Sequence, residues 1–230
     1  MKRLTGRSTL VIFILLANAA VFLSGQENSK SAVDFFKDTR SASLQALPDS
    51  FNAGLSGQTI DKKLSSIPKD SYLDKSKGLT AAVFYSKQKG ISIQVMNVDD
   101  LYRDIYKDLP RQFFAIDILL SDKTTESFLS QYEVSYYSGE PAWTILKLRI
   151  RNAENTVLLY AGKENHQIER IDYLLGANLM STTRVFYDNE QADGKNYSIP
   201  VRFVSKILTG NNTEKTEVFE MINLKLRQNN

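Results

Sequence analysis

The carboxyl-terminal half of the chain consists of short runs in which apolar and polar residues alternate. Turn residues bound each run, and the runs recur at roughly 8 to 12 residue spacing. The connections are too short for a crossover helix, so the runs predict an antiparallel meander, with the stretch 188–196 as a long turn around Asp193-Gly194. The predicted strands are 133–137, 143–150, 156–160, 168–175, 180–187, 198–208 and 216–226.

The amino-terminal half mixes helical and strand patterns. Its most apolar stretch, 113–120, is too dense for an exposed helix and must pack under another layer. Together the patterns predict one α+β domain with a long curved antiparallel sheet and helices on its concave face. The predicted elements are a helix at 32–47, a strand at 51–60, a helical turn at 61–67, hairpin strands at 79–86 and 91–97, a helix at 101–109 capped by Asp99, and a helix at 125–131.

Two of the late strands carry apolar residues on both faces. Phe203 and Val204 point to opposite sides of one strand, as Met221 and Ile222 do in the other. Either helices cover both faces or the surplus apolar surface lines a ligand cavity, although ordinary core packing explains any single large side chain. The candidate cavity-lining residues are Phe84, Met96, Phe113, Phe114, Trp143, Met180, Phe186, Phe203, Phe219 and Met221.

Residues 1–25 have the pattern of a signal peptide. Three basic residues precede an apolar run at 10–23 that is short for a bilayer span, and small residues follow it; an uncleaved anchor is the alternative. The chain has no cysteine, so it has neither disulfides nor the lipidated cysteine of a bacterial lipoprotein. We therefore expect residues 26–230 to form a single periplasmic domain, with secretion as the other possible destination.

The charge balance argues against two classes of partner. The chain has 29 Lys+Arg and 26 Asp+Glu, a net charge of +3, but residues 1–25 hold three of the basic residues and none of the acidic ones. Since 29 − 3 equals 26, the remaining chain is formally neutral. Such a chain lacks the basic surface of a nucleic-acid binder and the polybasic stripe of a membrane-surface helix.

The sequence offers little for catalysis. His166 is the only histidine, and no Gly-x-Ser-x-Gly elbow, phosphate loop or calcium loop is present. Two acidic pairs, Asp99 with Asp100 and Glu164 with Glu169, fit a helix cap and a solvated turn. We expect no enzyme activity, no metal and no cofactor; a secreted hydrolase would need an acidic pair that converges in a cleft.

Several segments in the middle and at the end of the chain follow one another in a familiar order. They are Leu109-Pro110 with the apolar run 113–120, Gln131-Tyr132-Glu133-Val134, the strands 144–148 and 157–160, Gln167-Ile168-Glu169-Arg170-Ile171, Ser198-Ile199-Pro200 and Met221-Ile222-Asn223-Leu224. In pattern and order the chain resembles the periplasmic lipoprotein-carrier (LolA-like) superfamily. It departs from that family in lacking an arginine-rich strand pair near its amino terminus and in its long turn at 188–196, so no individual functional residue is carried over.

The resemblance implies an unclosed β-barrel whose hydrophobic cavity, covered by helices, binds acyl chains of lipoproteins or lipids. It also implies transport in the periplasm between an inner-membrane exporter and an outer-membrane acceptor, by a monomeric carrier. The family's acceptors are themselves lipoproteins, which a chain without cysteine cannot be. The alternative function is a non-catalytic envelope interaction or sensor module that uses the same sheet to bind a protein.

Overall fold

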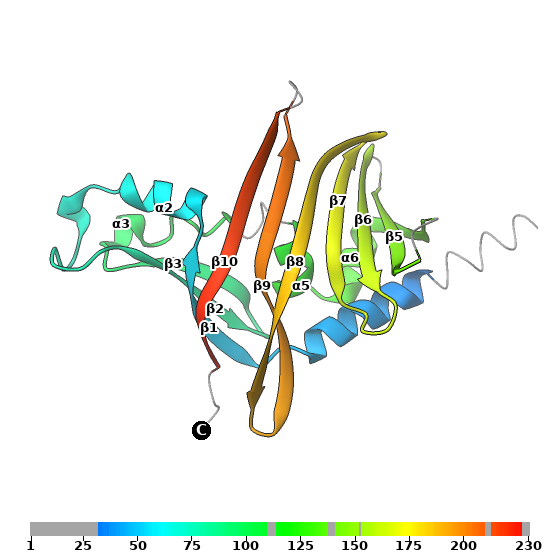
Figure 1. Cartoon of the computed structure of the whole chain (residues 1–230), viewed down its shortest axis with the longest axis horizontal. Helices are drawn as coiled ribbons and strands as arrows, with labels where there is room; N and C mark the ends of the chain where they lie inside the picture. Colours follow the sequence, from blue (N-terminus) through cyan, green and yellow to red (C-terminus); the bar gives the residue numbers. More distant parts are fainter. Residues whose placement is uncertain (1–31, 110–113, 138–140, 152, 210–212, 227–230) are drawn as a thin grey trace, which may run out of the picture.

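The computed structural model describes residues 32–109, 114–137, 141–151, 153–209 and 213–226. The predicted signal peptide and the candidate residue Phe113 lie outside these described residues. The structure has one ten-stranded antiparallel sheet in the order β3-β2-β1-β10-β9-β8-β7-β6-β5-β4, with helices packed against it (Figure 1). The strands are β1 Ser50–Ser56, β2 Thr80–Ser86, β3 Gly90–Met96, β4 Tyr132–Tyr136, β5 Trp143–Ile150, β6 Asn155–Gly162, β7 Ile168–Leu175, β8 Asn178–Ala192, β9 Lys195–Leu208 and β10 Glu214–Leu226.

The sheet is unclosed, because β3 and β4 are its two ends and do not pair with each other. The first and last described strands lie side by side within the sheet, where β1 pairs with β10 from Phe51–Leu226 to Ser56–Glu220 with a register shift between Asn52 and Gly54. The α+β fold class with an unclosed antiparallel sheet, predicted from the sequence, is therefore confirmed.

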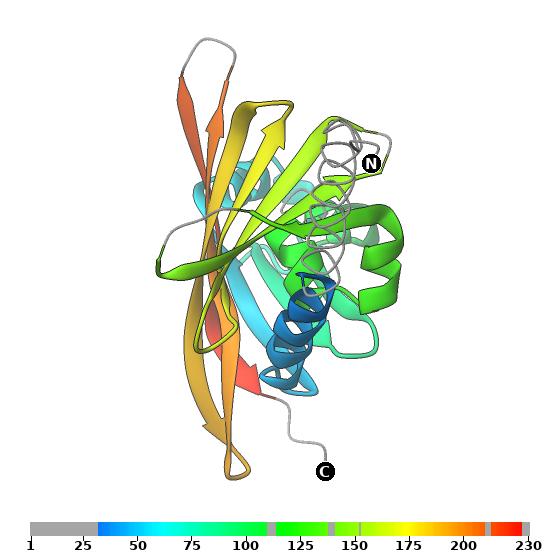
Figure 2. The same ribbon diagram turned by 90° about the vertical axis from the view of Figure 1, so that its right-hand side faces the viewer.

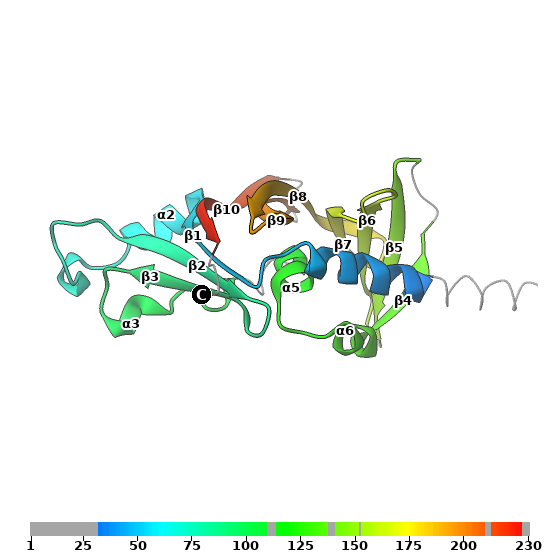
Figure 3. The same ribbon diagram turned by 90° about the horizontal axis from the view of Figure 1, so that it is seen from below.

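Helices cover one face of this sheet. Residues 32–45 form the first helix, and with α5 (Phe114–Leu120) and α6 (Thr125–Gln131) it lies on the same side of the strands (Figures 2 and 3). The remaining described helices are α2 (Gln58–Ser65), the short 3₁₀ helix η1 (Lys69–Ser71) and α3 (Asp100–Arg103). No helix among the described residues is long and apolar enough to cross a membrane.

Three sequence predictions about the elements need correction. The strand predicted at 51–60 ends at Ser56, because Gln58–Ser65 forms α2. The stretch 188–196 is not a long turn: β8 and β9 continue as a hairpin as far as Ala192 and Lys195, around Asp193 and Gly194, which both have positive φ. Alternation ends near Tyr187 because this part of the hairpin extends beyond its neighbours and both its faces are solvated. The helix predicted at 101–109 is also shorter, since regular helix ends at Arg103 and turns follow.

Polar side chains satisfy the first amides of two helices, as the sequence predicted for Asp99 but not for Thr124. The Asp99 side chain accepts a hydrogen bond from the Leu101 amide, and Thr124 Oγ1 accepts one from the Ser127 amide at 3.1 Å. The first places α3, and the second starts α6 directly after α5. These short-range bonds set where α3 and α6 begin.

Candidate functional site

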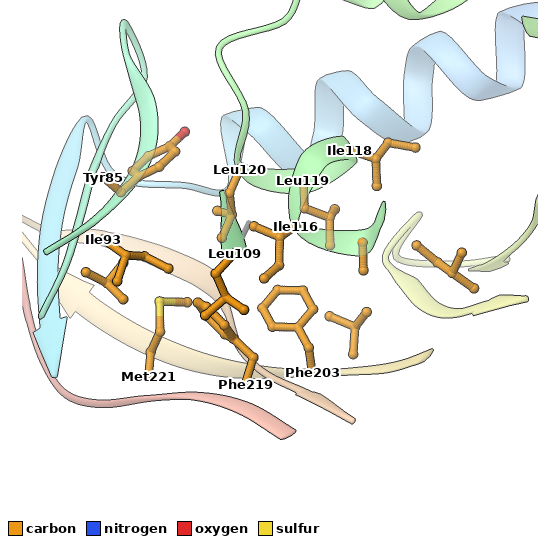
Figure 4. Close-up of a cluster of buried hydrophobic side chains, with 14 of the residues drawn as sticks. Tyr85, Ile93, Leu109, Ile116, Ile118, Leu119, Leu120, Phe203, Phe219 and Met221 are labelled. Atoms are coloured by element: carbon orange, nitrogen blue, oxygen red, sulfur yellow. The ribbon is translucent and has the colours of Figure 1, made fainter. Parts of the chain in front are cut away.

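The candidate site is the face of the sheet that the helices cover, here called the concave face. Its strands contribute a continuous apolar surface at which Phe203 and Phe219 meet edge to face, with ring centroids 5.7 Å apart. Three α5 residues face these strands from the opposite side: Ile116 and Leu119 lie over the rings, and Leu120 lies above Leu109 (Figure 4). All five side chains are buried. Packing of this density is ordinary protein core, and in this state the space is filled by the protein's own side chains.

Two of the described hollows lie elsewhere, and another, of about 260 Å³, lies beside α5 at Asp117 and Lys123. A groove of about 590 Å³ lies on the opposite, outer face of the sheet, over Gly54, Ala82, Phe84 and Met96. A second cleft, of about 540 Å³, lies on the same face at Trp143. Among the described residues, α5 side chains fill the space between sheet and helices where the sequence analysis expected an open hydrophobic cavity.

Arg40 joins the helices that cover the concave face. It lies on the first helix and is 1% exposed, and its guanidinium donates hydrogen bonds to the carbonyl oxygens of Ile118 (2.5 Å) and Lys123. Its guanidinium carbon lies 4.2 Å from the ring centroid of Phe128 in α6. One side chain therefore holds the end of α5, the connection to α6, and α6 itself.

The position of Arg40 follows from helix chemistry. The last carbonyls of an α-helix lack intrahelical partners, and the helix dipole attracts a cation there. Because Ile118 belongs to the last turn of α5, the guanidinium satisfies a carbonyl that would otherwise be buried without a donor. The second cation near Phe128 is Lys123, which is 5.3 Å from that ring centroid and bonded to Asp117 at 2.6 Å.

Burial makes this arrangement costly to maintain. Loss of solvent around Arg40 lowers the pKa of its guanidinium from 12.5 to about 10, although the nearby carboxylate of Asp117 opposes the shift. A shift of that size corresponds to about 3 kcal/mol against the charged form. The Nε atom is also buried without a hydrogen-bond partner among the described residues. The Arg40 contacts therefore hold the helices together, although burying the charged guanidinium costs free energy.

Nine of the ten candidate residues are described, and eight of these divide between the two faces. Phe203, Phe219 and Met221 are buried in the concave-face core, and Phe114 packs against that core and meets Tyr132 edge to face. On the outer face, Phe84 and Met96 line the groove, whereas Trp143 and Phe186 line the cleft; Met180 is half-buried on β8. The structure thus brings four of them to the helix-covered interior and leaves four at solvent-facing hollows.

Sequence reasoning missed Arg40. The signal was available in its spacing, because Ala32, Phe36 and Arg40 recur every four residues and share one buried side of the first helix. A charged residue in an apolar stripe is unusual, since arginine is seldom fully buried unless paired. Its partners are carbonyl groups far along the chain, which no local pattern reveals.

The cleft at Trp143 is the second hollow with organised polar groups. Asp172, 3% exposed, accepts two hydrogen bonds from Arg170 (2.9 and 2.6 Å) and one from the Tyr160 hydroxyl (3.0 Å). The Trp143 indole donates to Glu169 at 2.8 Å. These bonds fix the walls of the cleft around a small apolar cluster of Ile145, Leu158 and Tyr160.

Replacing Asp172 by asparagine is expected to lower the free energy of unfolding by about 1–2 kcal/mol. The substitution keeps the shape but removes the charge that Arg170 pairs with, and partial solvent access of Arg170 limits the loss. Equilibrium urea unfolding measures it. The matched variant Asp70→Asn, at an exposed ion pair with Lys75, should change stability by less than about 0.5 kcal/mol; equal effects would mean that the Asp172 network contributes nothing special.

The residues considered for catalysis have other structural roles. His166 lies in a turn with positive φ and packs against Phe35 with tilted rings, 5.1 Å between ring centroids. Asp99 caps α3, and Glu169 accepts from Trp143. Within the described residues, no three His, Cys, Asp or Glu side chains are grouped so as to hold a metal ion.

The comparisons with known proteins do not add to this geometry. No protein-family model matches the chain, and no curated protein matches it.

Proposed function

We propose that the protein is a non-enzymatic periplasmic carrier of lipid-modified cargo, which binds acyl chains on the concave face after α5 and α6 move away. The single observation that carries the proposal is the pairing of a continuous apolar sheet face with a cover of two short helices fastened by one buried arginine. An inner-membrane exporter and an outer-membrane acceptor would be its partners, as the resemblance to lipoprotein carriers implies.

The energetics permit an exchange of helix for acyl chain. Transfer of a ~16-carbon chain from water contributes roughly 12 kcal/mol before the costs of ordering and association. Undocking α5 exposes five buried apolar residues, four of them large, each worth about 1.5–3 kcal/mol. Because the two terms are of the same order, the net affinity stays modest, which lets a carrier release its cargo. The flexible thioether of Met221 suits an adaptable binding surface.

The first test is native mass spectrometry of the mature protein purified from an envelope fraction. The proposal expects additional mass that corresponds to lipid or acylated protein, and delipidation should remove it. Protein that is free of lipid before any treatment, and that does not take up a synthetic triacylated lipopeptide, would contradict carriage.

The second test measures movement of the helices. The chain has no cysteine, so spin labels can be placed at exposed positions without background: Glu126 on α6 and Lys206 on β9. Pulsed electron paramagnetic resonance should show a longer distance when the triacylated lipopeptide is added and no change with the same peptide lacking acyl chains. A control pair within the sheet, Arg149 with Lys206, should stay constant in both cases.

The filled interior favours a second function if both tests fail. An envelope interaction or sensor module needs no internal cavity and can use the outer face, where Met96 and Ile222 are 43% and 41% exposed. A protein that carries no lipid and keeps its helices docked in the presence of the lipopeptide would be of this kind.

A further inference from the structure

The outer-face cleft combines an unneutralised cation with aromatic walls. Its lining includes Arg184, Phe186 and Trp143, and its volume of about 540 Å³ lies within the range of small-ligand sites. Phe186 is 45% exposed although it is a large apolar side chain. The cleft lies on the face of the sheet opposite the helices, so it is independent of the proposed acyl-binding surface.

Strand register concentrates positive charge at this position. Arg170 on β7 lies directly opposite Arg184 on β8, and Phe186 lies opposite Arg202 on β9. Like charges directly across a strand pair are unfavourable, so such a pair needs compensation. Asp172 compensates Arg170 with two hydrogen bonds, and Glu220 approaches Arg202 at 3.8 Å.

Arg184 receives no such compensation. Its side chain is exposed and makes no hydrogen bond or ion pair with any residue that the structure describes. It stands beside Phe186, two residues along the same strand on the same face, and Arg202 lies 5.7 Å from the Phe186 ring centroid. The cleft therefore offers one unused guanidinium next to an exposed ring.

The walls of the cleft are fixed before any ligand arrives. Trp143 is held by Glu169 and Arg170 by Asp172, so binding would require little further ordering of side chains. Elsewhere in the lining, Gln167 donates a hydrogen bond to Ser198 at 2.7 Å, and Asn189 adds an amide side chain. Such a rim of amide and hydroxyl groups can hydrogen-bond a peptide backbone.

We propose that this cleft binds an extended acidic peptide segment of a partner protein, whose carboxylate pairs with Arg184 while a flanking apolar side chain packs between Trp143 and Phe186. Arginine and aromatic residues dominate the energetics of such contacts. A planar anionic membrane fits less well, because Glu169 and Glu220 stand among the arginines and would meet the same negative surface.

The test uses the full mature protein and an array of labelled pentapeptides with a central aspartate flanked by each apolar residue, beside the same array with asparagine. Fluorescence anisotropy should show binding to aspartate peptides that weakens at least fivefold in Arg184→Gln and at high salt. The control Arg149→Gln, another exposed arginine on a strand, should bind as the unmodified protein does.

Three results would overturn the proposal. They are equal binding of the aspartate and asparagine arrays, no binding to either, and retention of binding in Arg184→Gln. A parallel arm uses vesicles with about one quarter phosphatidylglycerol, because basic residues also attract anionic lipids. Vesicle binding that depends on Arg184, without peptide binding, would assign the cleft to a membrane instead. Because lipid uptake does not involve this face, Arg184→Gln should leave lipopeptide-dependent helix movement unchanged, which separates this inference from the proposed function.

Discussion

Replacing Arg40 by methionine is expected to lower the free energy of unfolding by about 2–4 kcal/mol and to loosen α5 and α6 more than the strands. Methionine fills similar space but donates nothing to the carbonyl oxygens of Ile118 and Lys123, and it loses the contact of the cation with Phe128. Each buried acceptor that lacks a donor costs about 1–3 kcal/mol of stability. Removal of the desolvated charge offsets part of this destabilisation.

Chemical denaturation measures the total loss in the free energy of unfolding, and hydrogen exchange shows which elements lose stability. A local loss of 2 kcal/mol corresponds to about thirtyfold faster exchange of the amides in α5 and α6. Arg103→Met is the matched control, because Arg103 forms an exposed ion pair with Asp100 and should contribute under about 1 kcal/mol. Uniform acceleration over sheet and helices alike would contradict a specific fastening of the helices by Arg40.

Loosening the helices should also change lipid uptake. If α5 and α6 must leave the concave face before acyl chains bind, Arg40→Met lowers the cost of that step and the triacylated lipopeptide binds more tightly at equilibrium. A carrier with a weakened cover would be expected to gain affinity and lose stability together. Loss of both would indicate that Arg40 holds the fold and has no gating role.

Truncating Phe203 to alanine is expected to destabilise the domain by about 3–5 kcal/mol. Phe203 is 0% exposed, meets Phe219 edge to face and faces the apolar side of α5, so its removal leaves a void in packed core. Urea unfolding of the purified variant, compared with the unmodified protein, gives the difference.

Phe186→Ala is the control for that experiment, since Phe186 is a phenylalanine on the neighbouring strand but on the outer face. Its loss should cost under about 1 kcal/mol. If Phe203→Ala also changed the free energy of unfolding only slightly, the interior would be loosely packed, and a cavity for acyl chains would exist before the helices move.

The sequence predicted the strand series well because each strand carries its own signal. The bounds Trp143–Ile150 for β5, Ile168–Leu175 for β7 and Thr125–Gln131 for α6 agree with the predicted 143–150, 168–175 and 125–131. Alternation with period two, turn residues and the Asp99 cap are local properties, so they can be read in order along the chain. Prediction failed in the long hairpin of β8 and β9, where neither face is buried and alternation disappears.

The sequence could not assign the apolar residues to their faces. It identified ten large side chains as one candidate set, but the structure places four of them in a buried interior and four at two outer hollows. Alternation shows that Phe203 and Arg202 lie on opposite faces; it does not show which face the helices cover. The register that sets Arg170 against Arg184 likewise depends on pairing between separate strands.

By itself, then, the sequence determined the α+β class, the antiparallel strand series and the absence of cysteine chemistry, since all three depend on composition or on contacts between near neighbours. Only the tertiary structure decided that β1 pairs with β10, that α5 fills the concave face, and that Arg40 fastens the helices through carbonyl groups about 80 residues away. The physical reason is that every residue type has the same backbone carbonyl. A hydrogen bond to such a carbonyl therefore does not depend on, and cannot be predicted from, the residue that accepts it.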